Sequence, residues 1–410
     1  MKHLNNNGGP VPFNGLSRRG FMTLVGGSAT VIASGIRPVF AQEETKSAVT
    51  TPAGNRMHVK PLPEPYFISH GTSVEMNWMQ KQNDPRYLMD TGQFFVRNHT
   101  ATPIIDATTW RLLIDGGGVE KALEISYEEL LKMPSKTVTR FIECAGNCRS
   151  LFNEVLGTPG QGTQWGTGGY GVAEWSGVPL SDVLEKAGLK NSAVSIMASG
   201  LDESNFEKPL PIGKALGEDT LLVTAMNGAP LPYDHGFPVR LLEPGWVGSY
   251  NVKWLGRLHV GEEQLYSKWN TSSYVLKGEG YEDPEGPSEG EVIREQTIKS
   301  VLALPRPGTL PAGNQTIRGY AWSPYGPIEK VEVSLDDGKT FKPAKLIGPN
   351  IGAAGVRWEF SINAKPGKMT IIPRATDANG HSQIPIAEQK HNVKGYVWEA
   401  VIPHQITFVG

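Results

Sequence analysis

Short apolar runs alternate with polar turns along most of the chain, and the pattern changes once, at an acidic, Gly- and Pro-rich segment over residues 278–290. Before this segment, strand-like runs alternate with short amphipathic stretches that are typical of helices. The strands predicted there cover residues 110–114, 220–225, 239–242 and 257–260. No βαβ unit repeats, so the pattern predicts a mixed α+β domain.

Two helices of this domain are predicted from their end signals. Ser126 is the expected cap of a short helix that extends to Leu131, and Glu129 lies three residues after Ser126, which is the capping-box pattern. Ser181 is the expected cap of a second helix over residues 180–187, because Gly188 then stands where helices commonly end.

Beyond residue 290 the chain has the pattern of strands alone. Asp336-Asp337-Gly338-Lys339 is a hairpin turn signal between two of them. The strands predicted in this region cover residues 316–322, 328–335, 356–362 and 369–376. Short strands with regularly spaced turns predict an immunoglobulin-like β-sandwich, a module that packs or pairs more often than it catalyses.

The N-terminal segment has the composition of an export signal. Residues 1–41 contain basic side chains and no acidic residue. Ser17-Arg18-Arg19-Gly20-Phe21-Met22 precedes an apolar stretch too short to span a bilayer, and Val39-Phe40-Ala41 offers a small-residue cleavage site. The pattern predicts a twin-arginine signal peptide, with an ordinary secretory signal or a basic tail as alternatives. Because twin-arginine export moves folded proteins, we expect a periplasmic protein and look for a bulky cofactor site.

Composition narrows the possible functions. The 410 residues include 48 Gly and 31 Pro, yet 39% are hydrophobic, so the chain is rich in turns and still able to form a core. A formal net charge of −2 argues against a protein built around nucleic-acid phosphates. The two cysteines, Cys144 and Cys148, are too few for a disulfide scaffold or a four-cysteine metal site, and no Cys-x-x-Cys-His motif attaches a haem.

Cys144 is the first candidate for chemistry. An apolar run ends at Cys144, and Ala-Gly-Asn then allows a tight turn to Cys148. Arg140 and Arg149 flank the pair, and nearby cations favour a thiolate, so we expect an exposed thiolate at the end of a strand. A disulfide between the two cysteines, or two inert buried thiols, is the alternative.

A glycine-rich segment, Gly166-Thr167-Gly168-Gly169-Tyr170-Gly171, matches the dinucleotide-binding fingerprint as a string. No strand of β-branched residues precedes it, so the context of that fingerprint is missing. We expect a loop that passes close to a ligand or to another backbone.

Other segments combine His, Arg and Lys with turn residues. They are Phe95-Val96-Arg97-Asn98-His99, Asp234-His235-Gly236-Phe237-Pro238-Val239-Arg240, and Asn251-Val252-Lys253-Trp254. Together they indicate an anionic, phosphate-bearing cofactor, since Arg and Lys are the usual partners of phosphate oxygens.

These segments, together with Glu143-Cys144-Ala145-Gly146-Asn147, resemble the sulfite oxidase family of molybdopterin enzymes, and within it the bacterial sulfite or sulfane dehydrogenases of the thiosulfate-oxidising system. The resemblance implies a molybdopterin-binding catalytic domain over residues 42–290 and an immunoglobulin-like dimerisation domain over residues 291–410, after the signal peptide. It also implies a molybdenum-dependent oxidoreductase that oxidises an inorganic sulfur centre, sulfite or protein-bound sulfane sulfur, by oxo transfer.

The resemblance extends to individual residues. Cys144 matches the thiolate ligand of molybdenum, a soft donor suited to a high-valent metal. The residues matching groups around the pterin and its phosphate are Phe95, Val96, Arg97, Asn98, His99, Cys144, Asp202, His235, Arg240, Asn251, Val252 and Lys253. The residues matching the catalytic site are Arg97, Cys144, Arg149, Trp165, Tyr274 and Lys394.

Two residues depart from the family pattern. Cys148 stands where relatives usually carry Gly or Arg, and Lys394 stands where a substrate-binding arginine is expected. Lysine keeps the charge and loses the bidentate fork, so the choice between sulfite and sulfane sulfur stays open.

The resemblance also bears on partners. We expect no haem in this chain, so electrons must leave singly to a separate c-type cytochrome or a haem subunit. A homodimer or a heteromer through the C-terminal domain is expected, with neither a nucleic-acid partner nor a membrane span. The alternatives are a sulfoxide-type reductase of the same superfamily, against which the all-β C-terminal domain argues, and a non-catalytic exported binding module.

Overall fold

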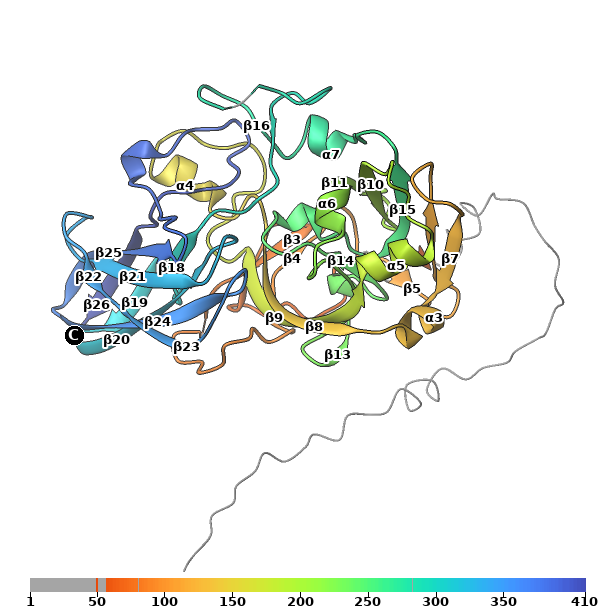
Figure 1. Ribbon diagram of the computed structural model, residues 1–410. Helices are drawn as coiled ribbons and strands as arrows, with labels where there is room; N and C mark the ends of the chain where they lie inside the picture. The colour runs from red at the N-terminus through yellow and green to blue at the C-terminus, as the bar shows by residue number, and fades with distance from the viewer. Residues whose placement is uncertain (1–48, 51–56, 80, 282) are drawn as a thin grey trace, which may run out of the picture. The chain divides into compact units, whose positions relative to one another are not determined.

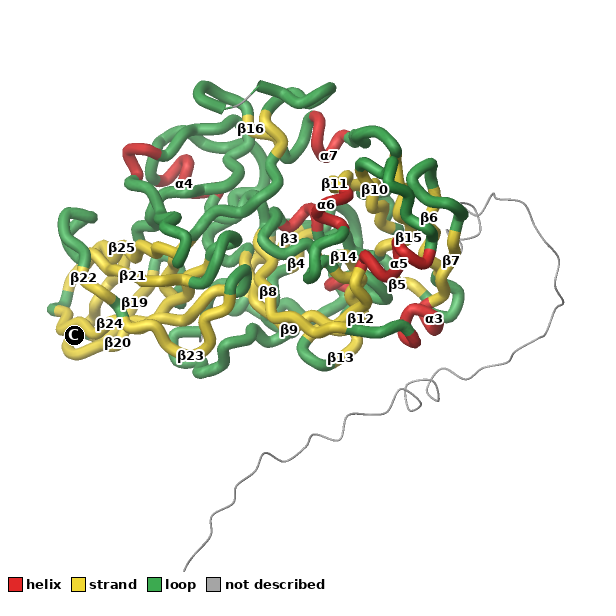
Figure 2. Tube along the Cα trace, viewed as in Figure 1, coloured by secondary structure: helices red, strands yellow, loops and turns green. Residues whose placement is uncertain are grey.

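The computed structural model describes residues 49–50, 57–79, 81–281 and 283–410, and the segment expected to be a signal peptide lies outside them (Figure 1). Strands dominate the described chain and the helices are few and short (Figure 2). The α-helices are α3 (Tyr127–Lys132), α4 (Arg149–Glu154), α5 (Leu180–Lys186), α6 (Ile212–Ala215) and α7 (Lys268–Thr271). None of the helices in the described ranges has the length and apolar character that crossing a membrane requires.

Two larger sheets build the first domain. One has the strand order β11-β10-β15-β6-β7, and the other has the order β13-β12-β9-β8 with β14 paired to β12. The first sheet contains β6 (Arg111–Asp115), β7 (Leu123–Ser126), β10 (Ser195–Gly200), β11 (Glu207–Pro211) and β15 (Leu255–Gly261). The second contains β8 (Lys136–Glu143), β9 (Tyr170–Pro179), β12 (Leu221–Met226), β13 (Ala229–Pro230) and β14 (Arg240–Leu242). Strands mixed with short helices agree with the predicted α+β class.

Smaller strand pairs complete this region. A three-stranded sheet joins β2 (Phe67–Ser69), β3 (Ser73–Met76) and β4 (Val96–Arg97). Two-stranded sheets pair β1 (Val49–Thr50) with β5 (Ile104–Ile105), and β16 (Val275–Leu276) with β17 (Glu291–Val292). Since β4 carries Val96 and Arg97, the small three-stranded sheet positions the first of the predicted cofactor segments.

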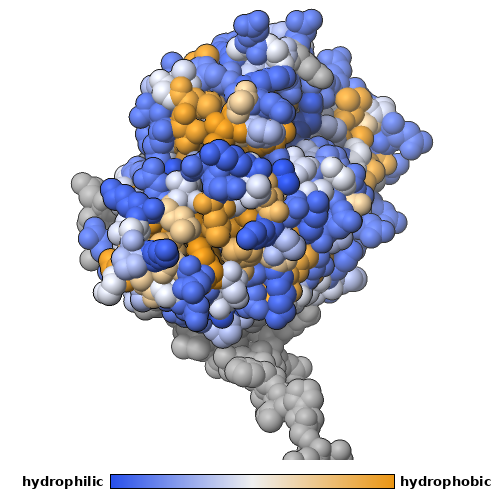
Figure 3. Space-filling view, turned by 90° about the vertical axis from the view of Figure 1, so that its left-hand side faces the viewer, coloured by the Kyte–Doolittle hydropathy of each residue, from blue (hydrophilic) through white to orange (hydrophobic). Residues whose placement is uncertain are grey.

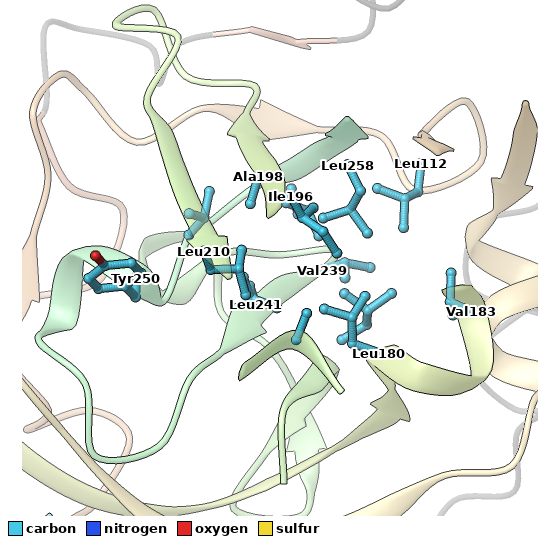
Figure 4. Close-up of a cluster of buried hydrophobic side chains, with 14 of the residues drawn as sticks. Leu112, Leu180, Val183, Ile196, Ala198, Leu210, Val239, Leu241, Tyr250 and Leu258 are labelled. Carbon is cyan, nitrogen blue, oxygen red and sulfur yellow. The ribbon is translucent and has the colours of Figure 1, made fainter. Parts of the chain in front are cut away.

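An apolar core holds the first sheet, α5 and β14 together (Figure 4). Its buried side chains come from several elements, including Leu112, Leu180, Val183, Ile196, Ala198, Leu210, Val239, Leu241, Tyr250 and Leu258. Burying a side chain of this size stabilises the fold by about 1.5–3 kcal/mol. Phe141 and Ile142 of β8, and Cys144 after them, belong to a second buried cluster, so two packed cores hold the strands whose ends carry the candidate site.

The C-terminal domain is all-β. Its two sheets have the orders β18-β20-β24-β23 and β19-β26-β25-β21-β22, and side chains of both contribute to one apolar core. The first contains β18 (Lys299–Leu302), β20 (Gly313–Trp322), β23 (Lys345–Ile351) and β24 (Gly355–Ala364). The second contains β19 (Gly308–Pro311), β21 (Ile328–Ser334), β22 (Lys342–Pro343), β25 (Gly367–Asp377) and β26 (His404–Val409). The predicted hairpin turn lies between β21 and β22, where Asp337 and Gly338 have φ values of 59° and 83°.

One predicted helix cap is confirmed and the other is wrong. Ser126 accepts from the Glu129 backbone N–H, and the Glu129 carboxylate accepts from the Ser126 backbone N–H, which completes the capping box. Ser181 does not cap α5, because β9 runs directly into the helix and the N-cap is Pro179. The Leu180 N–H donates to the carbonyl of Thr220 on a neighbouring segment, a long-range contact that starts the helix before Ser181.

The glycine-rich loop follows the expectation of close backbone approach. A Cβ atom at Gly168 would lie 1.8 Å from the carbonyl oxygen of Met76. The Gly168 N–H donates to the buried carboxylate of Glu75, and so does the Gly166 N–H. The loop is therefore held by protein contacts that leave no room for a side chain.

Gly168→Ala is expected to destabilise the protein by about 1–3 kcal/mol or more, because the added methyl group must displace backbone atoms. Gly213→Ala is the matched control, since a Cβ at this exposed helical position meets nothing within 4 Å. Urea unfolding of both variants measures the difference. Equal midpoints for the two would contradict the close approach.

Candidate active site

Two pockets meet at Cys144. The first has a volume of about 750 Å³ up to its open mouth and is lined mostly by the segments that carry the predicted cofactor residues. The second, of about 610 Å³, is lined by Arg97, Cys144, Arg149, Gln161, Gly162, Thr163, Trp165, Tyr274, Lys394 and Tyr396. Arg97, Cys144 and Tyr274 line both pockets.

The structure brings the predicted site residues together. Every residue assigned to the cofactor lines the first pocket, and every residue assigned to catalysis lines the second. They come from segments far apart in the chain, from β4 to the segment after β25. Their roles toward a cofactor or substrate stay predictions.

Hydrogen bonds fix the backbone of Cys144 at the end of β8. Its N–H donates to the carbonyl of Gly169 at 2.8 Å, and its carbonyl accepts from the Asn147 N–H at 2.9 Å. The Asn147 side chain donates to the Glu143 carboxylate and accepts from the Gly169 N–H, each at 2.9 Å. The tight turn after Cys144 is thus closed by its own asparagine.

The expectation of an exposed thiolate is wrong for the protein alone. Cys144 is 8% exposed, and burial raises the pKa of its thiol against the smaller opposing effect of Arg97 and Arg149. Both cysteines are free and buried, as in the buried-thiol alternative. Cys148 is fully buried in an apolar cluster, which raises the pKa of its thiol to about 12. Two nearby cations therefore do not lower the pKa of the Cys144 thiol below its usual value where the surroundings exclude water.

Cationic groups surround the inner part of the first pocket. Arg240 donates to the carbonyls of His235 and Asn251 at 3.1 and 3.2 Å. Lys253 Nζ donates to the Asn98 side chain and, at 2.8 Å, to the carbonyl of Asp234. Desolvation lowers the pKa of Arg240 to about 9 and holds that of Lys253 well below its usual range. An anionic ligand would favour the charged forms of both groups, because a nearby negative charge raises the pKa of a cationic side chain.

Lys60 places an amine beside His235 that the sequence pattern did not indicate. Its Nζ lies 3.3 Å from His235 Nε2 and also donates to the carbonyl of Phe94. Desolvation lowers the pKa of Lys60 to about 7. The pKa of His235 also lies well below its usual value, because the ring is buried and because Lys60 and Lys253 are close to it. The imidazole of His235 is therefore neutral at pH 7 in the protein alone.

Unpartnered polar atoms test whether the first pocket fits a cofactor. Among the residues that the structure describes, four buried polar atoms that line this pocket have no hydrogen-bond partner: His99 Nε2, Arg240 Nε, Ser249 Oγ and Asn251 Nδ2. Buried polar groups are normally paired, so these atoms are available to a polar ligand. Most of them can donate, which suits the phosphate oxygens and ring acceptors of a pterin cofactor.

An aromatic wall closes another side of the first pocket. The His99 ring stacks on Phe206 with a centroid distance of 5.0 Å and lies 4.2 Å from the ring centroid of Trp269. Burial lowers the pKa of His99 to about 2, so the ring is neutral. Asp202 accepts from the Phe206 N–H at 3.0 Å and from the Thr100 hydroxyl at 3.3 Å, which fixes its carboxylate beside this wall.

The donor set also restricts the metal. The described part of the chain holds no cluster of three or more His, Cys, Asp or Glu side chains suited to a metal ion. Cys144 alone offers a soft ligand at the junction of the pockets. This arrangement fits a metal whose remaining ligands come with its cofactor, as in a molybdopterin.

Arg149 is the most firmly held cation of the second pocket. Its guanidinium donates to the carbonyls of Lys394 and Thr163, each at 2.7 Å, and lies 5.0 Å from the ring centroid of Tyr396. A Cβ at Gly146 would lie 2.6 Å from Arg149 Nη2, so the glycine makes room for the guanidinium. The side chain is thus ordered before any substrate arrives.

Several residues that line the pockets carried no signal that the sequence motifs revealed. Tyr396 stacks on Tyr274 with a centroid distance of 5.4 Å and an interplanar angle of 17°. Tyr396 lies two residues after Lys394, a predicted site residue, and this closeness in the sequence was the signal that could have identified it. Gln161 accepts from Lys394 Nζ at 3.3 Å, and Ser249 lines the first pocket. Gln161 lies in a loop and Ser249 in a short 3-10 helix (Gly248–Tyr250), and no local sequence pattern distinguishes either residue from a surface position.

Comparison with known proteins supports one family across both domains. Residues 99–269 match the oxidoreductase molybdopterin binding domain, and residues 290–401 match the Mo-co oxidoreductase dimerisation domain. The chain is similar to the crystal structure of the sulfane dehydrogenase SoxCD from Paracoccus pantotrophus, with a TM-score of 0.72 and 25% identity, covering 95% of this chain and 98% of that one.

Two sulfite oxidases extend this result. The chain is 35% identical to the sulfite oxidase of Gallus gallus over 332 residues, which covers 76% of this chain and 71% of the relative. It is also 35% identical to the mitochondrial sulfite oxidase of Macaca fascicularis over 331 residues, covering 77% of this chain, and it spans only 60% of that relative's length. The site geometry, the two matched domains and these relatives together show that the chain belongs to the sulfite oxidase family of molybdopterin oxidoreductases.

Proposed function

We propose that this protein is a molybdenum-dependent dehydrogenase that oxidises a small inorganic sulfur group, either sulfite or sulfane sulfur. The observation that carries the proposal is the junction at Cys144, where a cationic pocket with unpartnered donors meets a second pocket lined by Arg97, Arg149 and Lys394. When bound, the molybdenum cofactor supplies the two-electron oxo-transfer chemistry.

The residues of this chain bind and orient the cofactor and the substrate. Cys144 holds the metal, and the donors of Arg240, Asn251 and Lys253 receive the cofactor's phosphate. In the second pocket Arg97, Arg149 and Lys394 neutralise a sulfur oxyanion, and the fork of an arginine can engage two oxygens at once. Trp165 is 1% exposed and forms an apolar wall that excludes water.

A separate electron acceptor, a c-type cytochrome or haem subunit, completes the proposed reaction. Export by the twin-arginine route would place the enzyme in the periplasm, where such carriers occur. Removing residues 1–41 makes the chain more acidic, because this segment holds basic and no acidic residues. An acidic surface favours encounter with a basic carrier.

We also propose that the C-terminal domain is immunoglobulin-like and mediates pairing. Its two sheets over one core support a sandwich, and the matched family model is a dimerisation domain. Figure 3 shows apolar groups between polar ones on one face of the molecule. Sedimentation of the mature protein tests pairing, and a monomer at micromolar concentration would contradict it.

The full proposal is tested on protein expressed with its own leader in a host that makes the molybdenum cofactor. We expect an equimolar amount of molybdenum in the purified chain, and reduction of cytochrome c that depends on sulfite or on a low-molecular-weight persulfide. Protein without molybdenum would contradict the cofactor assignment. Metal-loaded protein that oxidises neither compound would contradict the substrate class.

A further inference from the structure

Lys208 occupies a core-facing position of β11. Side chains alternate along a strand, so Lys208 shares its face with Phe206 and Leu210, both of which belong to the apolar core. The lysine is 0% exposed. It makes no ion pair among the described residues, so its amine is buried without a carboxylate.

The amine of Lys208 meets three aromatic residues. Its Nζ donates to the carbonyl of Trp269 at 2.5 Å. It lies 4.4 Å from the ring centroid of Tyr250 and 4.9 Å from that of Tyr274. The carbonyl anchors the amine, and the amine in turn contacts the tyrosine that lines both pockets.

Tyr274 needs such support. Its φ of 54° lies in the left-handed region, which is unfavourable for a bulky residue and persists only where surrounding contacts enforce it. Tyr396 stacks on its ring and Arg149 lies over Tyr396, so one set of contacts comes from the second pocket. Lys208 supplies a further contact from β11.

Stability does not account for the lysine. Burial holds its pKa well below the usual range, and in either protonation state a buried amine costs stability relative to an apolar side chain of similar size. One carbonyl and two ring faces offset this only in part. Methionine would fill the same space without the desolvation cost.

We propose that Lys208 is a positioning residue that fixes Tyr274 at the junction of the two pockets, with its amine anchored on the carbonyl of Trp269. The inference rests on the proposed function for its catalytic consequence. Its structural consequence, an ordered α7 and Tyr274 segment, does not depend on the substrate.

Lys208→Met is expected to leave the unfolding midpoint unchanged or higher, and to lower kcat by about 10- to 100-fold with little change in KM, because small displacements of an active group cost rate. Tyr274→Phe removes the hydroxyl and keeps the ring. If Lys208 acts by placing that hydroxyl, Lys208→Met adds little to the loss already caused by Tyr274→Phe.

Hydrogen–deuterium exchange of the purified protein gives a readout independent of activity. Peptides covering residues 266–276 should exchange faster in Lys208→Met, while those from β20 should not change. Lys268→Met is the matched control, since Lys268 is exposed and its Nζ lies 4.5 Å from the ring centroid of the same Trp269. It should show neither effect.

Several outcomes would overturn the inference: wild-type kcat in Lys208→Met, an undiminished loss in the Tyr274→Phe background, exchange unchanged over residues 266–276, or equal effects in Lys268→Met. Metal-loaded wild type that oxidises no sulfur compound would overturn the proposed function alone. The exchange experiment would then still decide the role of Lys208.

Discussion

Cys144→Ser is expected to lower kcat by about 10³-fold or more, a loss of at least about 4 kcal/mol in transition-state stabilisation, while the chain stays folded. Cys144 is the single thiol at the junction of the two pockets. A serine hydroxyl is a harder ligand than a thiolate and stays protonated at neutral pH. It would therefore bind poorly to a metal that prefers a soft sulfur ligand. Turnover normalised to molybdenum content, with urea unfolding, measures both effects.

Cys148→Ser provides the matched control for this experiment. Cys148 is also a buried free thiol, four residues away, and it lines neither pocket. We expect its replacement to destabilise the fold modestly, by about 1–3 kcal/mol for a buried hydroxyl in an apolar cluster, and to leave turnover per molybdenum unchanged. Substantial turnover in metal-loaded Cys144→Ser would refute the ligand assignment.

Glu143→Gln is expected to reduce the free energy of unfolding by about 3–5 kcal/mol. Glu143 is 0% exposed, and its carboxylate lies 3.1 Å from Lys299 Nζ while accepting from Asn147 and Trp322. The neutral amide would leave the Lys299 ammonium buried without its counter-charge. It would also turn an N–H group toward one of the donors. Denaturant unfolding measures the loss.

The same pair links the two domains. Lys299 begins β18 of the C-terminal domain, and Glu143 directly precedes Cys144, so the pair ties that domain to the end of β8. Adding Lys299→Met to Glu143→Gln should recover part of the loss, because the uncompensated charge disappears. Lys345→Met, which breaks the exposed pair with Glu359, should cost less than about 1 kcal/mol. Equal losses for the exposed and buried pairs would contradict this account.

Local structure was predictable where short-range contacts decide it. The capping box at Ser126 and the hairpin turn at residues 336–339 depend on residues next to them in the chain, and both are present. The strands beyond residue 290 were predictable because apolar and polar residues alternate along them, as they do where one face of a strand is buried. The cap at Ser181 failed because the start of α5 depends on Thr220, which lies 40 residues from Leu180 and is brought close only by the sheet.

The sequence by itself determined the family and, through its motifs, the segments that line both pockets. What it did not determine was burial, which sets the charge state and the neighbours of each group. Arg97 and Arg149 act on the Cys144 thiol, yet packing removes water and raises its pKa. Lys208 stands between Glu and Pro like a surface residue, and only the packing of β11 against Tyr250, Trp269 and Tyr274 encloses it. Desolvation arises from atoms distant in the chain, so only the tertiary structure decided it.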